Sequence, residues 1–548
     1  MLQIPFSEAT IEPGTVISWT LRTKHSPPPS PSRSISAPPS DSTCTSVAAS
    51  NSTSKSTSTS ASISASFNQD KHHLSSEATR STSDGIASSI TVTFEIAGLL
   101  DTEALESALL LLVRRHEVLR SEFQRLAGDL NCTALAPESM VLEAEEAGRF
   151  HTADDLHIHL DKTFKSIDTL SWPLFLMGAV VREASATVYL CFDHIVCDGL
   201  SMPVVVNELQ TSYAALTARR TPQLPPAGSY LVFGDEQRRR YAALRADDDR
   251  LTYWKDFIRG NGGFFPRFPF DLGVPEDQLY PLVNRSLPLL DPRRTDALAA
   301  GARTSGGSVF TAVLAAAATA QHRFGGPGVY RGLLPISERT EEGAGEPGRE
   351  SRREPGREPG RKAETESGSG LARDLGGTPN PWQHSIGWFV NTMPIEFRVG
   401  EGGADHATTI ARARTAYGEL QRHAGVPFVR AWELLAPETF SLHHWPCPVN
   451  FFSYIDFRRT PGGLQHPLWK PTLHVWAARG NGISHWFHRT ATGLHVNMLH
   501  VDTPQAHEIS DALHAELVRV LLEIAGERGA GRPVSIPRPS RETTTARG

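Results

Sequence analysis

The stretch YLCFDHIVCDGLS, residues 189–201, places one histidine, one aspartate and one glycine at fixed spacing between two regular segments. Residues 187–192 are β-branched, aromatic or apolar, which predicts a buried strand. Ser201 can cap a following helix, because the apolar residues after it recur at helical spacing. The stretch therefore predicts a strand, a tight turn that begins at His194, and a helix.

A histidine at the end of a buried strand is well placed for proton transfer. The scaffold holds its ring in position, and an unperturbed imidazole titrates near neutral pH. Asp198 either touches a substrate or locks the turn through an ion pair with a distant arginine. Gly199 can adopt backbone angles that are closed to other residues. His194 is thus the candidate general base, with Asp198 and Gly199 as its support.

The spacing D-H-x-x-x-D-G resembles the H-H-x-x-x-D-G signature of the condensation-domain and acyltransferase superfamily. That superfamily includes nonribosomal peptide condensation domains, chloramphenicol acetyltransferase and the polyketide-associated acyltransferases. Five further segments follow in the family's order: RHEVLRSEF (115–123), YW (253–254), GLLPISER (332–339), IGWFVNTMP (386–394) and NFFSYID (450–456). Two more, PGTVISW and YIDFRRTPGG, look closer to the polyketide-associated acyltransferases than to peptide-forming domains.

Strand-like and helix-like segments alternate along most of the chain. Residues 91–96 read as a strand, and Asp101 can cap the helix after it. Ser308 can cap a helix over 309–324, a strand follows at 329–335, and 504–526 predicts a closing helix. This order predicts an α/β fold with mixed sheets. The resemblance implies two chloramphenicol-acetyltransferase-like lobes arranged as a V around a central tunnel.

The predicted domain organisation is an N-terminal lobe over 1–225, a C-terminal lobe over 226–535 and a flexible tail over 536–548. Two segments lack residues to bury. Residues from about 24 to 66 are mostly Ser, Thr, Pro and Ala, and about 340–370 repeat units such as REPGREPGR. Such composition predicts disordered inserts without a catalytic role, rather than docking segments.

The resemblance implies direct acyl transfer from a thioester to an alcohol, with His194 as the base and no covalent acyl-enzyme. It also implies that Asp198 pairs with Arg339 of the ISER segment, and that Gly199 leaves backbone space beside the base. The donor would be a phosphopantetheine thioester, on coenzyme A or on an acyl or peptidyl carrier protein, and it would be a co-substrate rather than a bound cofactor. The acceptor would be a small-molecule, lipid or polyketide alcohol.

One motif residue departs from the family pattern. Asp193 stands where relatives carry a first histidine, and successive strand residues point to opposite faces, so we expect Asp193 to point away from the cleft and to be structural. The candidate tunnel-lining residues are Asp193, Ser201, Asn391 and Thr392, with packing roles equally open for the last two.

Three other functions remain open at this stage. An amide-forming condensation enzyme would use the same chemistry on an amine, and a condensation-like binding module would be catalytically silent. Cys197, three residues after His194, could suggest a thiol hydrolase, although we expect a buried, inert thiol. His116 is expected to be a hydrogen-bonded structural histidine.

Charge and composition limit the kinds of partner and the cellular location that we expect. The net charge of −6 gives no attraction to nucleic acid, and no signal peptide or membrane-spanning run is evident. The five scattered cysteines are more typical of reduced thiols than of a disulfide framework, so we expect a cytoplasmic protein. We also expect a monomer. His157 and His159 are expected to share one strand face, and His443 adjoins His444, but neither pair has further ligands at metal spacing. We therefore expect no metal.

Overall fold

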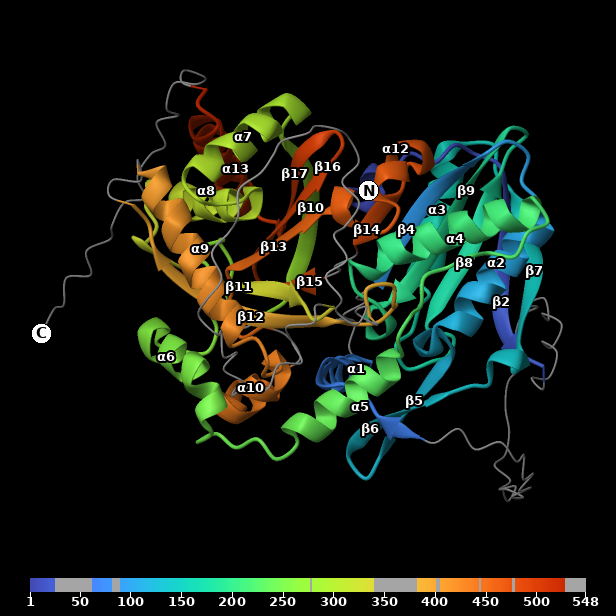
Figure 1. Cartoon of the computed structure of the whole chain (residues 1–548), viewed down its shortest axis with the longest axis horizontal. Coiled ribbons are helices and arrows are strands. Elements are labelled where there is room, and N and C mark those ends of the chain that lie inside the picture. Colours follow the sequence, from blue (N-terminus) through green and yellow to red (C-terminus); the bar gives the residue numbers. More distant parts are fainter. Residues whose placement is uncertain are drawn as a thin grey trace, which may run out of the picture.

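The computed structural model describes residues 1–24, 62–80, 89–275, 278–339, 382–400, 405–442, 445–475 and 479–527. These residues form two seven-stranded sheets and one three-stranded sheet. The two large sheets are the centres of two lobes that lie side by side (Figure 1). Both contain parallel and antiparallel pairs, so the predicted α/β fold with two mixed-sheet lobes is confirmed.

The first sheet is built around the strand that carries the motif. Strand β9 lies between β4 and β8, so it pairs along both edges. The strands in spatial order are β1 (Leu2–Gln3), β14 (Thr472–Val475), β4 (Ser89–Ala97), β9 (Ser185–Asp193), β8 (Phe175–Val181), β2 (Thr15–Thr23) and β7 (Met140–Arg149). The associated helices are α2 (Thr102–Arg115), α3 (Ala153–Phe164) and α4 (Ser201–Thr217).

Both faces of this sheet are covered, which explains why residues 188–192 of β9 are apolar or aromatic without a break. Leu190 and Phe192 belong to the core that includes α2 and α4, whereas Tyr189 and Cys191 pack with Leu160 and other residues of α3 on the opposite face. Alternate side chains of a strand point to opposite faces, so a strand between two helical layers must be apolar on both. The end of β9 is therefore held rigidly.

The second lobe has the same plan. Its strands, in spatial order, are β12 (Val390–Arg398), β11 (Val329–Ser337), β13 (Phe451–Asp456), β16 (Ile483–Thr490), β17 (Gly493–Val501), β10 (Tyr280–Leu290) and β15 (Arg479–Gly480). Its helices α7 (Pro292–Thr304), α8 (Val309–Arg323), α9 (His406–Arg422) and α13 (Pro504–Ile524) lie to the left of the sheet in Figure 1.

The capping residues act as the sequence predicts in two helices. Asp101 accepts a hydrogen bond from the Ala104 amide at the start of α2. Ser308 accepts from the Thr311 amide at the start of α8. In each case the cap satisfies a backbone donor that has no partner within the helix.

Strand β14 crosses between the lobes. It lies far along the chain, yet it pairs antiparallel with β4 and parallel with β1 in the first sheet. A division of the chain at residue 225 therefore leaves one strand of the first lobe's sheet in the second half. The domain boundary stays a prediction. The pairing of β14 with the first sheet is a feature that the predicted boundary does not include.

The elements between the lobes include a helix that directly follows the predicted first insert and that was not predicted. Helix α1 (Phe67–Thr79) begins at Ser66, which shares a capping box with Gln69. The remaining elements are the small sheet of β3 (Ile63–Ser64), β6 (Asp129–Ala134) and β5 (Ser121–Leu126), and helices α5 (Tyr230–Tyr241), α6 (Thr252–Asn261), α10 (Phe428–Leu435), α11 (Pro437–Phe440) and α12 (His466–Trp469).

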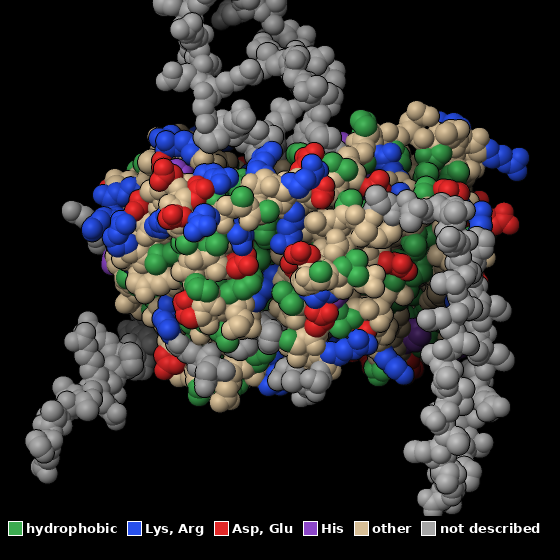
Figure 2. Space-filling model, turned by 90° about the horizontal axis from the view of Figure 1, so that it is seen from below, with side chains coloured by type: hydrophobic (Ala, Val, Ile, Leu, Met, Phe, Trp, Pro, Cys, Tyr) green, Lys and Arg blue, Asp and Glu red, His purple; other side chains and the backbone are tan. Residues whose placement is uncertain are grey.

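The predicted inserts fall mainly outside the described residues, as do the tail, Cys44, His443 and His444. The predicted end of the first insert, at about residue 66, is a few residues too late, because residues 63–66 include β3 and the cap of α1. Acidic and basic side chains are interspersed on the face shown in Figure 2. Within the described ranges, no helix is both long enough and apolar enough to cross a membrane.

Candidate active site

His194 lies on the first residue of a short 3₁₀ turn, immediately after β9. Its ring packs against Trp388, with the ring centroids 4.0 Å apart. The Nδ1 atom is buried, and no other described residue bonds to it. Burial and the nearby His72 lower the pKa of His194 to about 4, while its own backbone carbonyl and the carboxylates of Asp198 and Asp193 act in the opposite direction. The imidazole is thus an unprotonated base at neutral pH.

Asp198 and Arg339 form the predicted ion pair. The guanidinium Nη1 donates to one carboxylate oxygen at 2.7 Å and Nη2 to the other at 3.0 Å. Both side chains are buried. The carboxylate also accepts from the backbone amides of Ser201 and Phe389, so its oxygens are occupied by the protein itself. This arrangement fixes the turn that carries His194 to the second lobe, and it leaves no free oxygen for a substrate.

Ser201 belongs to the same network, although it does not cap α4 as predicted. It is the first residue of the helix and makes no cap hydrogen bond. Its hydroxyl instead lies 2.9 Å from an Asp198 carboxylate oxygen and 3.0 Å from the Gly387 carbonyl, either of which can accept its one hydrogen, and it accepts from Arg339. Because Ser201 is fully buried, it does not line the cavity.

The predicted role of the motif glycine is wrong in its conformational part. Gly199 does not have a positive φ, and a Cβ atom there would meet only Ile455 at an ordinary 3.5 Å. The glycine that needs its missing side chain is Gly387 in the second lobe. A Cβ at Gly387 would come within 2.3 Å of the Tyr230 ring. The close approach there lets the Gly387 carbonyl reach the Asp198 network.

Asn391 and Thr392 are adjacent and have different roles. Thr392 lines the cavity described below. The Asn391 side chain is buried, donates to the carbonyls of Ala424 and Val426, and accepts from the Phe428 amide. It therefore holds the start of α10 and does not line the cavity, which corrects its assignment as a lining residue.

Asp193 is buried at the end of β9. One carboxylate oxygen lies 3.0 Å from Nε2 of His72 and accepts from the Ile195 amide, and the other accepts from the Thr169 hydroxyl at 2.5 Å. Burial acts to raise the pKa of Asp193, but His72 and the other donors outweigh it and keep the pKa below the ordinary value. Asp193 does not line the cavity itself, as expected from strand alternation, but its partner His72 does.

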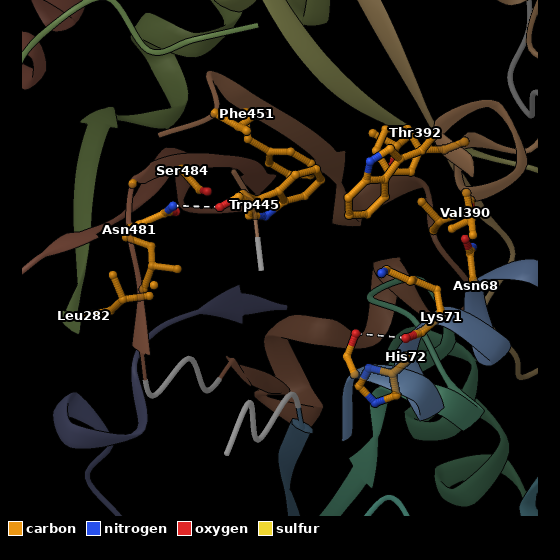
Figure 3. Close-up of a pocket in the computed structure, with 18 of the residues that line it drawn as sticks. Asn68, Lys71, His72, Leu282, Val390, Thr392, Trp445, Phe451, Asn481 and Ser484 are labelled. Atoms are coloured by element: carbon orange, nitrogen blue, oxygen red, sulfur yellow. Dashed lines mark hydrogen bonds between the residues drawn. The ribbon is translucent and has the colours of Figure 1, made fainter. Parts of the chain in front are cut away.

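A cavity of about 440 Å³ adjoins this site. Aromatic and aliphatic side chains make up most of its wall, among them Trp388, Trp432, Trp445, Phe451 and Trp486. Figure 3 shows Asn68, Lys71 and His72 projecting from α1 on one side, with Asn481 and Ser484 across from them. Such a lining suits a mostly apolar ligand with a few polar groups. Trp388 both lines this space and touches His194, so it lies between the cavity and the base.

Lys71 is the cation of helix α1 in this wall. Its Nζ atom donates to the carbonyls of Phe440 and Leu442 and lies 4.7 Å from the Trp432 ring centroid. Burial lowers the pKa of Lys71 to about 8. Lys71, His72 and Asn68 were not predicted as site residues, because they follow directly on a Ser-rich run. The S-x-x-Q pattern of Ser66 and Gln69 is the signal that marks the start of their helix.

The structure confirms one of the remaining histidine predictions and contradicts another, and it also bears on Cys197. Nε2 of His116 lies 2.9 Å from the Glu208 carboxylate in the core, which confirms a structural histidine. His157 and His159 lie on helix α3 and not on a strand, so that prediction is wrong. Burial raises the pKa of Cys197 well above its usual value, which is unsuited to a thiolate nucleophile. Among the described residues, no cluster of His, Cys, Asp and Glu could hold a metal ion.

Comparison with known proteins supports the resemblance drawn from the motifs. Residues 78–346 match the family model of the condensation domain. The 2'-acyl-2-O-sulfo-trehalose (hydroxy)phthioceranyltransferase PapA1 of Mycobacterium tuberculosis is 32% identical over 259 residues, which are 45% of this chain and 48% of PapA1. The trehalose-2-sulfate acyltransferase PapA2 of Mycobacterium bovis is 30% identical over 234 residues, which are 41% of this chain and 48% of PapA2. The chain thus spans about half the length of the curated relatives it matches.

Solved structures extend the similarity to nearly the whole chain. The structure of PapA2 acyl transferase superposes with a TM-score of 0.73 at 20% identity and covers 96% of this chain and 100% of its own. The first condensation domain of the calcium-dependent antibiotic synthetase gives a TM-score of 0.61 at 19% identity, over 86% of this chain and 98% of its own. The two-lobed condensation-domain fold and the resemblance to Pap-type acyltransferases are therefore confirmed.

Proposed function

We propose that this chain is an acyltransferase that moves an acyl group from a phosphopantetheine thioester to a hydroxyl group, with His194 as the general base. The observation that carries the proposal is the placement of that imidazole. It is fixed at the end of a buried strand, and its ring packs against Trp388, which lines the apolar cavity. The lowered pKa of His194 agrees with a role as a base. The names of the similar proteins support the reaction class.

In the proposed reaction, His194 takes the proton of the acceptor hydroxyl as its oxygen attacks the thioester carbonyl carbon. The tetrahedral oxyanion then collapses, the carbon–sulfur bond breaks, and the thiolate receives the proton from the imidazolium. Atoms and charges balance without a covalent enzyme intermediate. The carboxylates of Asp193 and Asp198 favour the protonated ring electrostatically, so they stabilise the transient imidazolium without touching the substrate.

The acceptor is proposed to be an alcohol because the similar curated proteins are named for acylation of trehalose derivatives. An amide-forming reaction is the second candidate, since condensation domains share the fold. A silent binding module is disfavoured because His194 and its ion-paired turn are intact. The donor thioester, on coenzyme A or on a carrier protein, and a cytoplasmic location remain part of the proposal.

The test offers the purified protein a panel of acyl-coenzyme A thioesters from acetyl to hexadecanoyl, with alcohols including trehalose and with matched amines. Thiol release and product mass are measured. We expect ester products, and His194→Ala should lower turnover by about 100- to 10,000-fold with an unchanged circular dichroism spectrum. His151→Ala, at an exposed histidine, is the matched control and should retain full activity. Wild-type turnover in folded His194→Ala, or amides as the only products, would contradict the proposal.

A further inference from the structure

Helix α1 presents a polar stripe to the cavity. Asn68, Lys71, His72 and Ser75 all line it, and their spacing of three and four residues puts them on one face of the helix. Two hydrogen bonds hold the helix across the lobes. Asn68 donates to the Val390 carbonyl at 2.7 Å, and Gln69 donates to the Ile195 carbonyl at 2.9 Å, inside the turn that begins at His194. The stripe is therefore positioned by the motif turn itself.

His72 is the member of this stripe whose orientation is fixed by the motif. Asp193 is ionised and acceptor-only, so the Nε2 atom of His72, 3.0 Å away, carries the hydrogen of their bond. In the neutral ring, Nδ1 then has a free lone pair. This second nitrogen makes no hydrogen bond to any described residue, and the His72 side chain, which is 9% exposed, lines the cavity. An oriented acceptor is thus available at the wall of the cavity.

Both imidazoles contact the same indole, that of Trp388. The ring of His72 meets Trp388 edge-on with centroids 5.5 Å apart, and His194 packs against the same indole at 4.0 Å. A substrate that fills the cavity next to Trp388 therefore lies beside His72. The pairing also explains the aspartate in the motif, because a histidine at residue 193 would place an imidazole where the carboxylate now meets His72 and Thr169.

We propose that His72, oriented by Asp193, is a substrate-positioning residue: its Nδ1 accepts a hydrogen bond from a hydroxyl or amide N–H of the substrate that occupies the cavity. This inference rests on the proposed acyltransferase function. It extends the expectation that Asp193 is purely structural, because the carboxylate acts on the substrate through a second side chain from α1. His72 performs no proton transfer in this role.

Chemical labelling tests the open nitrogen without requiring turnover. Diethyl pyrocarbonate acylates unprotonated imidazole nitrogens, and trypsin releases His72 in the peptide HHLSSEATR, residues 72–80, whose fragment ions separate the two adjacent histidines. We expect label on His72, suppressed by hexadecanoyl-coenzyme A or by another thioester of the panel. His151 is the control, since it is exposed and lies outside the cavity, so its label should form with or without a thioester. An unlabelled His72, or label that no thioester or acceptor of the panel reduces, would overturn the proposal.

Variants separate positioning from stability. His72→Phe keeps a ring against Trp388 and removes both nitrogens, and we expect KM for one of the two substrates to rise about 3- to 10-fold, as for loss of one neutral hydrogen bond. Asp193→Asn can donate to Nε2, which moves the ring hydrogen to Nδ1 and should produce a similar rise. The double variant should add little to either single change. His73→Asn is the control.

The outcomes distinguish this proposal from the function on which it rests. If esters form and His72→Phe and Asp193→Asn, both folded by thermal melting, keep wild-type KM values, the positioning role is wrong while the acyltransferase stands. If the variants lose folded protein but the remaining folded molecules keep wild-type kinetics, the positioning role is also wrong. His72 and Asp193 would then stabilise the fold without acting on the substrate. Protection of His72 by a thioester that is never transferred would leave the site in place and overturn the proposed function.

Discussion

Histidines of this chain differ in chemistry because their neighbours differ. His116 is bonded to a carboxylate in the core, whereas His194 has an indole against its ring and a buried Nδ1. Desolvation disfavours the charged imidazolium where no carboxylate compensates directly. The base of the proposed reaction is therefore distinguished by what surrounds it, which a motif alone does not specify.

The pH dependence of turnover should show this environment. Since the pKa of His194 is lowered to about 4, the ring is the free base above that pH and becomes protonated as the pH falls through it. We expect the acid limb of kcat/KM near pH 4, well below the value of about 6.5 for an unperturbed histidine. Thiol release is measured from pH 3.5 to 8, with fluorescence at each pH to exclude unfolding. A limb at pH 6–7 in folded protein would contradict the assignment.

Glu338 gives a pH-dependent effect on stability. Burial raises its pKa from 4.5 to about 7, against a hydrogen bond from Gln237, and no described residue bonds to its Oε2. The folded state therefore holds a proton that the unfolded state has lost, and stability decreases as the pH rises from about 4.5 through 7. Glu338→Gln should raise the free energy of unfolding by about 1–2 kcal/mol at pH 8 and change it little at pH 4.5. Equal effects at both pH values in urea titrations would show that Glu338 is already ionised in the fold.

At the level of elements, the turn after β9 is held from the opposite lobe. The carboxylate of Asp198 accepts hydrogen bonds from two guanidinium nitrogens of Arg339 and from the Phe389 amide. Both donor residues belong to the second lobe. The turn is therefore a joint between elements of both lobes, and its shape depends on each.

Double-mutant analysis tests this joint. Asp198→Ala and Arg339→Ala should each cost about 3–5 kcal/mol of stability, because each leaves the other charge buried and unpaired. The double variant should cost much less than the sum of the two. The free energies come from urea unfolding of all four proteins. Additive losses would mean that the two residues do not interact in solution, and loss of turnover without loss of stability would give Asp198 a catalytic role.

Elements with strong local signals were predictable from the sequence. The apolar strand β9, the caps at Asp101 and Ser308, and the helices α8 and α13 follow from local patterns, and the Asp198–Arg339 pair followed from the resemblance. Helix α1 was missed because composition was averaged over the Ser-rich run before it, and α3 was misread at LHIHL because two alternating histidines fit a strand over so short a window. The contact between His72 and Asp193 could not be predicted, because it depends on how two segments far apart in the sequence pack together.

For the whole molecule, the exchange of β14 joins the lobes mechanically. Leu473 lies on this strand and is buried in the core of the first lobe, opposite Val92 of β4. Its own chain neighbours belong to the second half. Unfolding of either lobe therefore removes contacts from the other, which favours a single cooperative transition.

Leu473→Ala should destabilise the first lobe although the residue belongs to the second half of the chain. Removing a buried leucine side chain costs about 2–5 kcal/mol, and the effect should lower the midpoint of one shared thermal transition. Calorimetry and near-ultraviolet circular dichroism measure it. The control is Leu464→Ala, since that side chain is 90% exposed. Two separate transitions, only one of them shifted, would show that the lobes unfold independently.

The same exchange imposes an order on synthesis. A nascent chain leaves the ribosome from its N-terminus, and β4 emerges hundreds of residues before its edge partner β14. During that interval β4 has an unpaired edge, and β1 has no strand to join, since it pairs only with β14 among the named strands. A stalled or truncated chain that ends before residue 472 would expose that edge to other chains. Translation speed and chaperone capture over the second half of the message should therefore govern the yield of soluble protein.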